Sequence, residues 1–186
     1  MSSRMFPFPG RDESYEIYIN DPCYSKIQKD DSEAVFDRAW NTGVNCADEF
    51  IFKHPDSVAE MATVLEGEGF SIETINKDYV IGNQRYFCEY HPKEMKITVY
   101  KESVQLWANQ QDLDYDEARN IILAHEYFHY LENTTIGWIS RQYMVPMLVI
   151  GKHTFGKTGV PALSEVAANA FANSIWNSYI CNKRNK

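Results

Sequence analysis

Cysteine is scarce in this sequence and follows no pattern. Four cysteines, Cys23, Cys46, Cys88 and Cys181, are spread over 186 residues without a CxxC pair. The absence of that spacing excludes a ribbon-type structural zinc site and a thioredoxin-like redox pair. We therefore expect buried free thiols, as is usual in a reducing compartment, and a cytoplasmic location.

Long apolar runs and basic clusters are also scarce. No apolar run reaches the roughly 18 residues needed to span a membrane, and residues 1–10 lack the apolar core of a signal peptide. The net charge of −8 disfavours nucleic-acid binding, because that affinity depends largely on Lys and Arg pairing with phosphates. We expect no membrane association and no direct contact with nucleic acid.

The composition is that of a folded globular chain. Hydrophobic residues make up 44% and aromatic residues 14% of the sequence, which is enough for one substantial core. No internal repeat and no low-complexity linker divides the chain. We expect a single domain over residues 1–186, with an irregular lead-in over 1–13 and a disordered tail over 182–186.

The spacing of apolar residues predicts an α+β fold. Helical spacing recurs in residues 32–53, 57–67, 103–107 and 116–132, and in a last helix from Pro161 or Ser164 to about Ile180. Alternation predicts strands at residues 15–19, 70–75, 85–90 and 95–100, which would form a small, mainly antiparallel sheet. Residues 133–160 mix apolar clusters with Gly and Pro. We expect this segment to be irregular, with at most one short helix, and to form a wall or lid of the site.

The stretch His125-Glu-Tyr-Phe-His129 lies within the predicted helix 116–132, whose N-cap is Asp114 or Asp116. Two histidines four residues apart share one helix face, so their imidazoles can bind one metal ion. Zn²⁺ held by two histidines and one carboxylate keeps a fourth position open for water and lowers its pKa to about 7. Glu126 could then accept the proton of that water. The HExxH pattern therefore predicts a zinc hydrolase.

The apolar character of this helix supports the same interpretation. The helix is apolar on nearly every side, so both histidines face the interior, where an unpaired polar group costs about 1–3 kcal/mol. Metal ligation would satisfy them. The competing interpretation is a pair of hydrogen-bonded core histidines beside an unrelated glutamate.

A third ligand is needed because two histidines alone bind zinc weakly. Glu165 is the candidate, since it lies in an otherwise apolar, alanine-rich helix that could approach the HExxH helix closely. The alternative is that the alanines serve helix packing only. Asn169 is a candidate support for a ligand, or else an ordinary interhelical donor. Glu132 could compete as a ligand, although its place near a helix end favours an exposed salt bridge.

A peptidase also needs a donor for the oxyanion and a place for the substrate. Tyr130, Tyr143 and His153 are candidate donors by position, and the alternative for each is a packing or surface role. We expect the substrate to lie along a sheet edge formed by Met95–Tyr100, held by main-chain hydrogen bonds.

Two motifs together carry a family resemblance. His125-Glu-Tyr-Phe-His129 and Glu165-Val-Ala-Ala-Asn-Ala-Phe-Ala172 resemble the HExxH and E-x-x-A-N-x-F-A motifs of ImmA/IrrE-type metallopeptidases. The match covers roughly residues 115–180. It departs from the family at Phe128, where members usually have a small residue, and residues 1–80 match no helix-turn-helix or sensor domain of the family.

The resemblance implies a small zincin-like α+β fold. Together with the strand and helix patterns, it predicts three to four mainly antiparallel strands packed on the HExxH helix, with further helices at both ends of the chain. It implies a gluzincin-like centre with Zn²⁺ on His125, His129 and Glu165, and with Glu126 as the base. It also implies endoproteolysis of an intracellular protein or peptide, in that family often a DNA-binding repressor.

Three functions are consistent with these residues. The first is a zinc endopeptidase. The second is a catalytically silent zincin-fold protein that acts as a binding or regulatory module, with the open metal position blocked by Phe128 or by residues 133–160. The third is a structural zinc site or a metal-free core, in which Glu165 points away from the histidines.

Overall fold

The computed structural model describes residues 10–55, 60–82 and 84–184, and within these ranges the fold is mixed α+β, as predicted. The α-helices are α1 (Arg11–Ile19), α2 (Ser32–Lys53), α3 (Met61–Gly67), α4 (Lys101–Gln110), α5 (Tyr115–Leu131) and α6 (Ala162–Arg184). The strands are β1 (Ser71–Ile75), β2 (Tyr79–Ile81), β3 (Gln84–Tyr86), β4 (Cys88–His91), β5 (Lys96–Tyr100), β6 (Met144–Ile150) and β7 (His153–Gly159). Three short helical segments complete the list: the 3₁₀ helices η1 (Tyr24–Lys26) and η3 (Ile139–Arg141) and the π-helix η2 (Glu132–Ile136).

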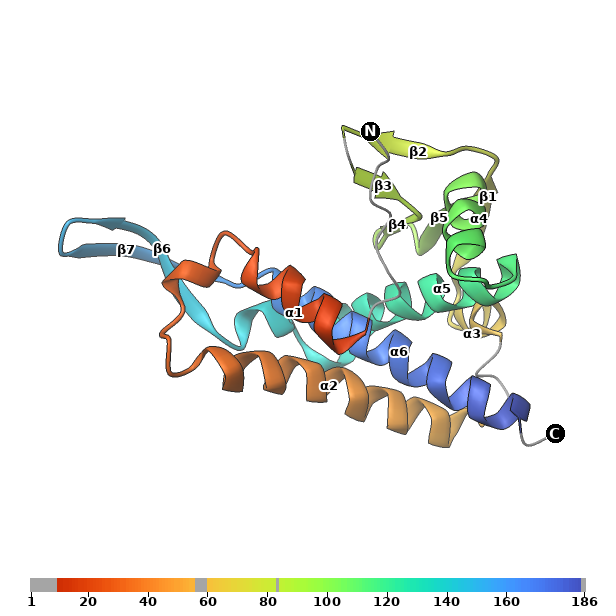
Figure 1. Ribbon diagram of the computed structural model, residues 1–186, viewed down its shortest axis with the longest axis horizontal. Coiled ribbons are helices and arrows are strands. Elements are labelled where there is room, and N and C mark those ends of the chain that lie inside the picture. The colour runs from red at the N-terminus through yellow and green to blue at the C-terminus, as the bar shows by residue number, and fades with distance from the viewer. Residues whose placement is uncertain (1–9, 56–59, 83, 185–186) are drawn as a thin grey trace.

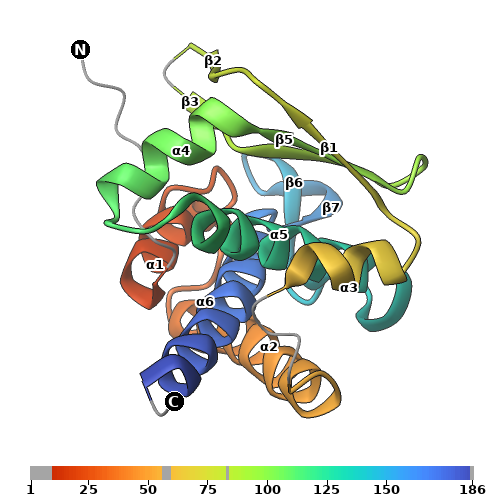
Figure 2. The same cartoon turned by 90° about the vertical axis from the view of Figure 1, so that its right-hand side faces the viewer.

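Helix α5 runs through the middle of the molecule. The sheet that contains β1 and β5 lies on one side of it, and α6 lies on the other (Figure 2). The helix begins at a capping box, in which the Glu117 N–H donates to Asp114 Oδ1 at 2.9 Å and the Asp114 N–H donates to Glu117 Oε2 at 3.4 Å. The predicted N-cap at Asp114 is therefore confirmed, and the start of the HExxH helix is fixed locally.

Helix α6 packs against α1, α2 and α5. The buried alanines of α6 allow α2 to approach closely, and Gly43 of α2 lies against Ala167 and Ala170 of α6. A Cβ atom at Gly43 would lie 2.1 Å from the carbonyl oxygen of Ala167, so no larger residue fits there without moving a helix. The first turn of α6 is also anchored, because the Ala162 N–H donates to Asp21 Oδ2 at 2.9 Å. The start of α6 is thus held in place on two sides.

The sheet beside α5 is mixed rather than mainly antiparallel. Its strand order is β1-β5-β4, with β1 parallel and β4 antiparallel to β5. The predicted substrate edge at Met95–Tyr100 is wrong, because β5 is the central strand and its residues Ile97 and Val99 are fully buried. The predicted strand 85–90 is split at Phe87 into β3, which pairs with β2, and β4, which forms an edge of this sheet.

The ends of the chain differ from the prediction. Residues 15–19 form part of α1 instead of a strand, because the buried side chains are Ser14 and Tyr18, one helical turn apart. The irregular lead-in therefore ends at Gly10 at the latest, and residues 1–9 lie outside the described ranges. Helix α6 continues to Arg184, so the predicted disordered tail is wrong for residues 182–184. The first residues of the predicted helix 57–67, residues 57–59, lie outside the described ranges.

Residues 133–160 are not irregular. After η2 and η3, strands β6 and β7 form an antiparallel hairpin that turns at Gly151, with φ of 60°, and projects from the body of the molecule (Figure 1). The pattern was misleading because Met144–Ile150 is a continuous apolar run without alternation. Such a run fits this hairpin because neither of its faces is covered beyond Pro146.

Two smaller expectations concern cysteines and membranes. All four cysteines are free, as predicted, although Cys181 is exposed and the other three are only half-buried. Within the described residues, no helix has both the length and the apolar character needed to cross a membrane.

Candidate metal centre

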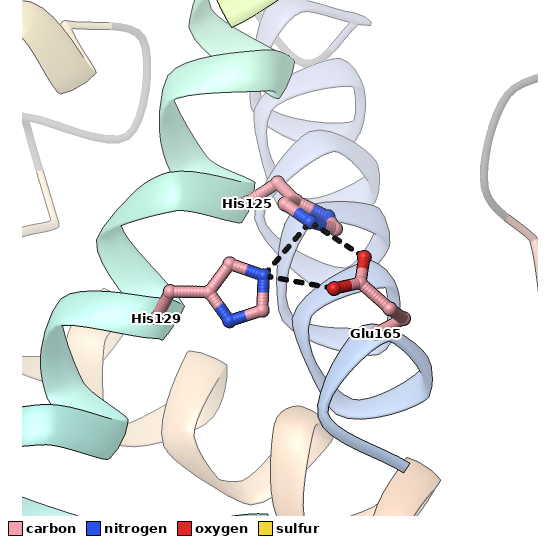
Figure 3. A group of neighbouring side chains, drawn as sticks. All are labelled: His125, His129 and Glu165. Atoms are coloured by element: carbon pink, nitrogen blue, oxygen red, sulfur yellow. Dashed lines mark hydrogen bonds and ion pairs between the residues drawn. The ribbon is translucent and has the colours of Figure 1, made fainter. Parts of the chain in front are cut away.

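Three side chains from α5 and α6 converge on one point (Figure 3). The Nε2 atoms of His125 and His129 are 3.1 Å apart. Glu165 places Oε2 at 3.4 Å from His125 Nε2 and Oε1 at 3.5 Å from His129 Nε2. The three predicted ligands are therefore brought together, and the arrangement in which Glu165 points away from the histidines is wrong.

The local sequence explains this convergence. Leu123, Ala124 and Phe128 are fully buried and fix α5 in the core, so the face that carries both histidines turns towards α6. In α6, the residues that follow Glu165 are buried, whereas the Glu165 side chain keeps 48% of its surface exposed. The histidine side chains are 20% and 19% exposed. The cluster thus lies at the margin of the core, with its carboxylate towards an opening.

The donor set fits zinc in type and in spacing. Zinc in proteins takes imidazole nitrogens and carboxylate oxygens at about 2.0–2.2 Å, and a tetrahedron of that size separates neighbouring donor atoms by about 3.3–3.6 Å. Here the two imidazole nitrogens are 3.1 Å apart, and His125 and His129 lie 3.4 and 3.5 Å from different oxygens of Glu165. Ligation through one oxygen would need a small shift of the carboxylate. His125, His129 and Glu165 could therefore hold Zn²⁺ with little movement of their side chains.

Glu132 supports His129 from behind. Its Oε2 lies 2.9 Å from His129 Nδ1, and its Oε1 accepts hydrogen bonds from the Ile139 N–H at 2.9 Å and from Ser164 Oγ at 2.7 Å. A carboxylate at Nδ1 keeps a proton there and directs Nε2 towards the cluster. The predicted exposed salt bridge at Glu132 is wrong, because the residue is 7% exposed. The spacing of three residues on one helix could have predicted the contact between Glu132 and His129. No feature of the sequence indicated the contact between Glu132 and Ser164.

The electrostatics of the cluster favour positive charge. Burial by itself lowers the pKa of His129, but the hydrogen bond to Glu132 and the charges of Glu165 and Glu126 raise it to about 9. Burial raises the pKa of Glu165, but the hydrogen bond to His125 and the charges of both histidines lower it to about 2. Without metal, an imidazolium at His129 therefore faces an ionised Glu165 at neutral pH. A divalent cation would meet the same negative surroundings.

Glu126 faces a cavity that His125 and Glu165 also line. Its Oε1 accepts a hydrogen bond from Cys88 Sγ at 3.1 Å. Burial and the nearby charge of Glu126 raise the pKa of the Cys88 thiol well above its usual value, so the sulfur keeps the proton that it donates. Cys88 lies on β4 and was missed at the sequence level, because no local spacing connects a strand residue with an HExxH helix.

The remaining predicted residues do not supply an oxyanion donor. The Tyr143 hydroxyl donates to Asp31 Oδ2 at 2.8 Å, and the Tyr130 hydroxyl donates to Glu68 Oε2 at 3.4 Å. His153 pairs with Ile150 at the exposed end of the hairpin. None of these three candidates is among the residues that line the two cavities at the cluster.

Asn169 and Phe128 have structural contacts. Asn169 Nδ2 donates to Ser14 Oγ at 3.2 Å, which is the interhelical alternative, although the residue also lines the cavity beside Glu165. Phe128 is fully buried with its ring centroid 5.8 Å from that of Phe171, so it does not block the space at the cluster.

Two cavities flank the cluster, and Glu165 lines both. One, of about 380 Å³, lies on the His125 side and has mainly apolar walls from α1, α4, α5 and the β3–β4 connection. The other, of about 560 Å³, lies on the His129 side and includes Tyr90, Trp138 and Arg141. Because Cys88 and Tyr90 are two residues apart on β4, this strand extends from one cavity to the other.

Comparisons with known proteins give no match for this chain. No protein-family model matches it, and neither a search of curated proteins nor a search of solved structures finds a match. The likeness to ImmA/IrrE-type metallopeptidases therefore rests on the two motifs themselves.

Proposed function

We propose that the protein is a zinc-dependent endopeptidase of the ImmA/IrrE type with a zincin-like fold, which cuts an intracellular protein substrate. The observation that carries the proposal is the convergence of His125, His129 and Glu165, whose donor atoms lie within 4.8 Å of one another, with Glu126 facing the adjoining cavity. The motif resemblance further favours a DNA-binding repressor as the substrate.

The residues of the chain have distinct tasks in this proposal. His125, His129 and Glu165 would hold Zn²⁺, with Glu132 orienting the His129 ring. The ion supplies a Lewis acid for the scissile carbonyl and makes water a better nucleophile at neutral pH. Glu126 accepts the proton of the attacking water and passes it to the leaving amine. Cys88 holds one oxygen of Glu126, which leaves the other free for that proton.

Strand β4 is the proposed guide for the substrate. It is an edge strand, so its outer main-chain groups can pair with an extended peptide. Its Cys88 side chain contacts Glu126, and its Tyr90 side chain lines the cavity at His129. A peptide added to this edge would therefore pass over the cluster.

The test compares the wild-type protein with Glu126→Gln. We expect about one zinc per chain in both proteins, and peptide cleavage lowered roughly 10²- to 10⁴-fold in the variant, since the proton acceptor alone is lost. Zinc is measured by elemental analysis of protein purified without added metal. Cleavage is measured by mass spectrometry on a pool of denatured cellular proteins.

Glu102→Gln is the matched control, because Glu102 is an exposed carboxylate on α4 that lines neither cavity at the cluster. It should keep both zinc and cleavage. Zinc-free wild-type protein that stays zinc-free after zinc is added would end the proposal. Cleavage that persists undiminished in Glu126→Gln would remove Glu126 from its proposed role.

A further inference from the structure

We propose that the cavity on the His125 side is a specificity pocket that takes one large apolar side chain of the peptide substrate. This inference rests on the proposed function, and it names the residue type that the site selects. The apolar pocket, as we call it, has walls formed by Ile17, Phe87, Trp107, Ile121 and Ile122.

The walls come from distant parts of the chain and meet beside His125 and Glu126 on α5. Ile17 belongs to α1, Trp107 to α4, and the two neighbouring isoleucines to α5. The rings of Phe87 and Trp107 lie 5.8 Å apart, centroid to centroid, and form one side. His125 and Glu126 line the same cavity. A side chain inserted here is therefore next to the proposed reacting bond.

The charges around the apolar pocket disfavour a charged occupant. Arg85 is the one cation of the Lys or Arg type among its lining residues, and its guanidinium is paired with Asp78 at 2.7 Å. The carboxylates of Glu126 and Glu165 also line the cavity, but Glu126 accepts a hydrogen bond from Cys88 and Glu165 is a proposed metal ligand. A charged side chain would therefore lose its hydration without gaining a free partner. The volume of about 380 Å³ leaves room for an aromatic or long aliphatic side chain.

The position of the pocket along β4 decides which substrate residue enters it. Cys88, the first residue of β4, lines the apolar pocket together with Phe87 just before the strand, whereas Tyr90 lines the other cavity. Strand residues are about 3.3 Å apart, so the two ends are about 7 Å from each other. This is the span of two peptide residues. The residue that enters the pocket is therefore a direct neighbour of the scissile bond.

The cavity on the His129 side has a different chemistry. It contains Glu132, Ser140 and Arg141, with the Arg141 guanidinium 5.1 Å from the centre of the exposed Trp138 ring. These groups offer polar contacts, and the lining of this cavity is less apolar than that of the apolar pocket. Selection for an apolar residue is therefore assigned to the His125 side alone, and Trp138 provides a matched control.

The test is a binding measurement on the full-length protein, with isoleucine methyl groups labelled for NMR. Two capped pentapeptides that differ only in a central Phe or Ala are titrated into zinc-loaded Glu126→Gln protein, and a third carries Lys. We expect the Phe peptide to bind at least about 10-fold more tightly than the other two. Its binding should shift the methyl signals of Ile17, Ile121 and Ile122.

Two variants sharpen this measurement. Ile17→Trp should fill part of the apolar pocket and remove the preference for Phe, whereas Trp138→Ala should retain it. Equal affinity for the three peptides would overturn the inference, and this comparison needs no variant to fold. Methyl shifts confined to Ile150 on the hairpin would also overturn it.

Failure of this inference can be told apart from failure of the proposed function. Binding selectivity for Phe without any cleavage by the wild-type protein would support the pocket and count against the peptidase. Cleavage of many peptides with no apolar residue beside the cut bond would support the peptidase and overturn the pocket.

Discussion

The cluster of His125, His129 and Glu165 and the β6–β7 hairpin differ in where they place polar and apolar side chains, although the hairpin lies in the chain between two residues of the cluster. In the cluster, His125, His129 and Glu165 are partly withdrawn from solvent, and each has a polar partner. In the hairpin, Leu148 and Ile150 are apolar and are 51% and 60% exposed.

The difference shows how strongly each region depends on specific polar contacts. A buried polar group without a partner costs about 1–3 kcal/mol, so the bonds of Glu132 to His129, Ile139 and Ser164 are needed to keep the cluster in one arrangement. The hairpin is a two-stranded ribbon, which alone is marginally stable in water. Changes in the cluster should therefore have large effects, and changes at the hairpin tip small ones.

The largest effect is expected for Glu165→Ala. Removing one of three ligands should weaken zinc binding by more than about 100-fold, which is the upper end for loss of a supporting partner. Zinc affinity is measured by competition with a chromophoric chelator. A variant that still binds zinc as tightly as the wild type would show that Glu165 is not a ligand, and would make the cluster resemble an ordinary buried ion pair.

A smaller loss is expected for Glu132→Gln. The amide can still accept a hydrogen bond at His129 Nδ1 but carries no charge, so zinc affinity should fall about 10- to 100-fold. The same chelator competition applies, with Ser164→Ala as the control, because it removes a single donor to Glu132. A loss of zinc affinity larger than that of Glu165→Ala would indicate that Glu132 is the ligand and that Glu165 only supports the site.

Zinc binding should also release a proton at neutral pH. The pKa of His129 is raised to about 9 in the metal-free protein, so the ring is charged at pH 7, whereas a ligand must be neutral. About one proton per zinc should leave at pH 7, and this release should vanish as the pH rises through 9. Calorimetry in buffers of different ionisation enthalpy measures it. No release at pH 7 would mean that His129 is already neutral.

The same raised pKa determines how metal-free stability depends on pH. A group whose pKa is higher in the folded state stabilises that state fully below its unfolded pKa, which is about 6.5 for histidine. This contribution of His129 should be lost as the pH rises towards 9. Urea unfolding of metal-free protein at pH 6 and pH 9.5 tests the sign, with Glu132→Gln expected to flatten the difference.

Sequence reasoning succeeded where the structure depends on local spacing. The grouping of His125 with His129 follows from one helical turn, and the capping box at Asp114 from three residues. Glu165 could be selected because it was an isolated carboxylate in an apolar helix.

Sequence reasoning failed where the interacting residues come from distant segments of the chain. Cys88 reaches Glu126 only because β4 pairs with β5 at the sheet edge, and Ser164 reaches Glu132 only because α6 packs on α5. Residues 15–19 alternate like a strand but form a helix, since tertiary burial of Ser14 and Tyr18 outweighs local pattern.

The smallest effect is expected at the hairpin tip. The double variant Ile150→Thr with Phe155→Thr alters side chains that are 60% and 52% exposed, so the free energy of unfolding should change by less than about 0.5 kcal/mol. Val160→Ala, just after the hairpin at a fully buried position, should cost roughly 1–3 kcal/mol. Urea unfolding of both proteins measures the contrast. If the tip variant lost as much stability as Val160→Ala, the exposed apolar residues would be part of the folded core, and the opposition between hairpin and cluster would fail.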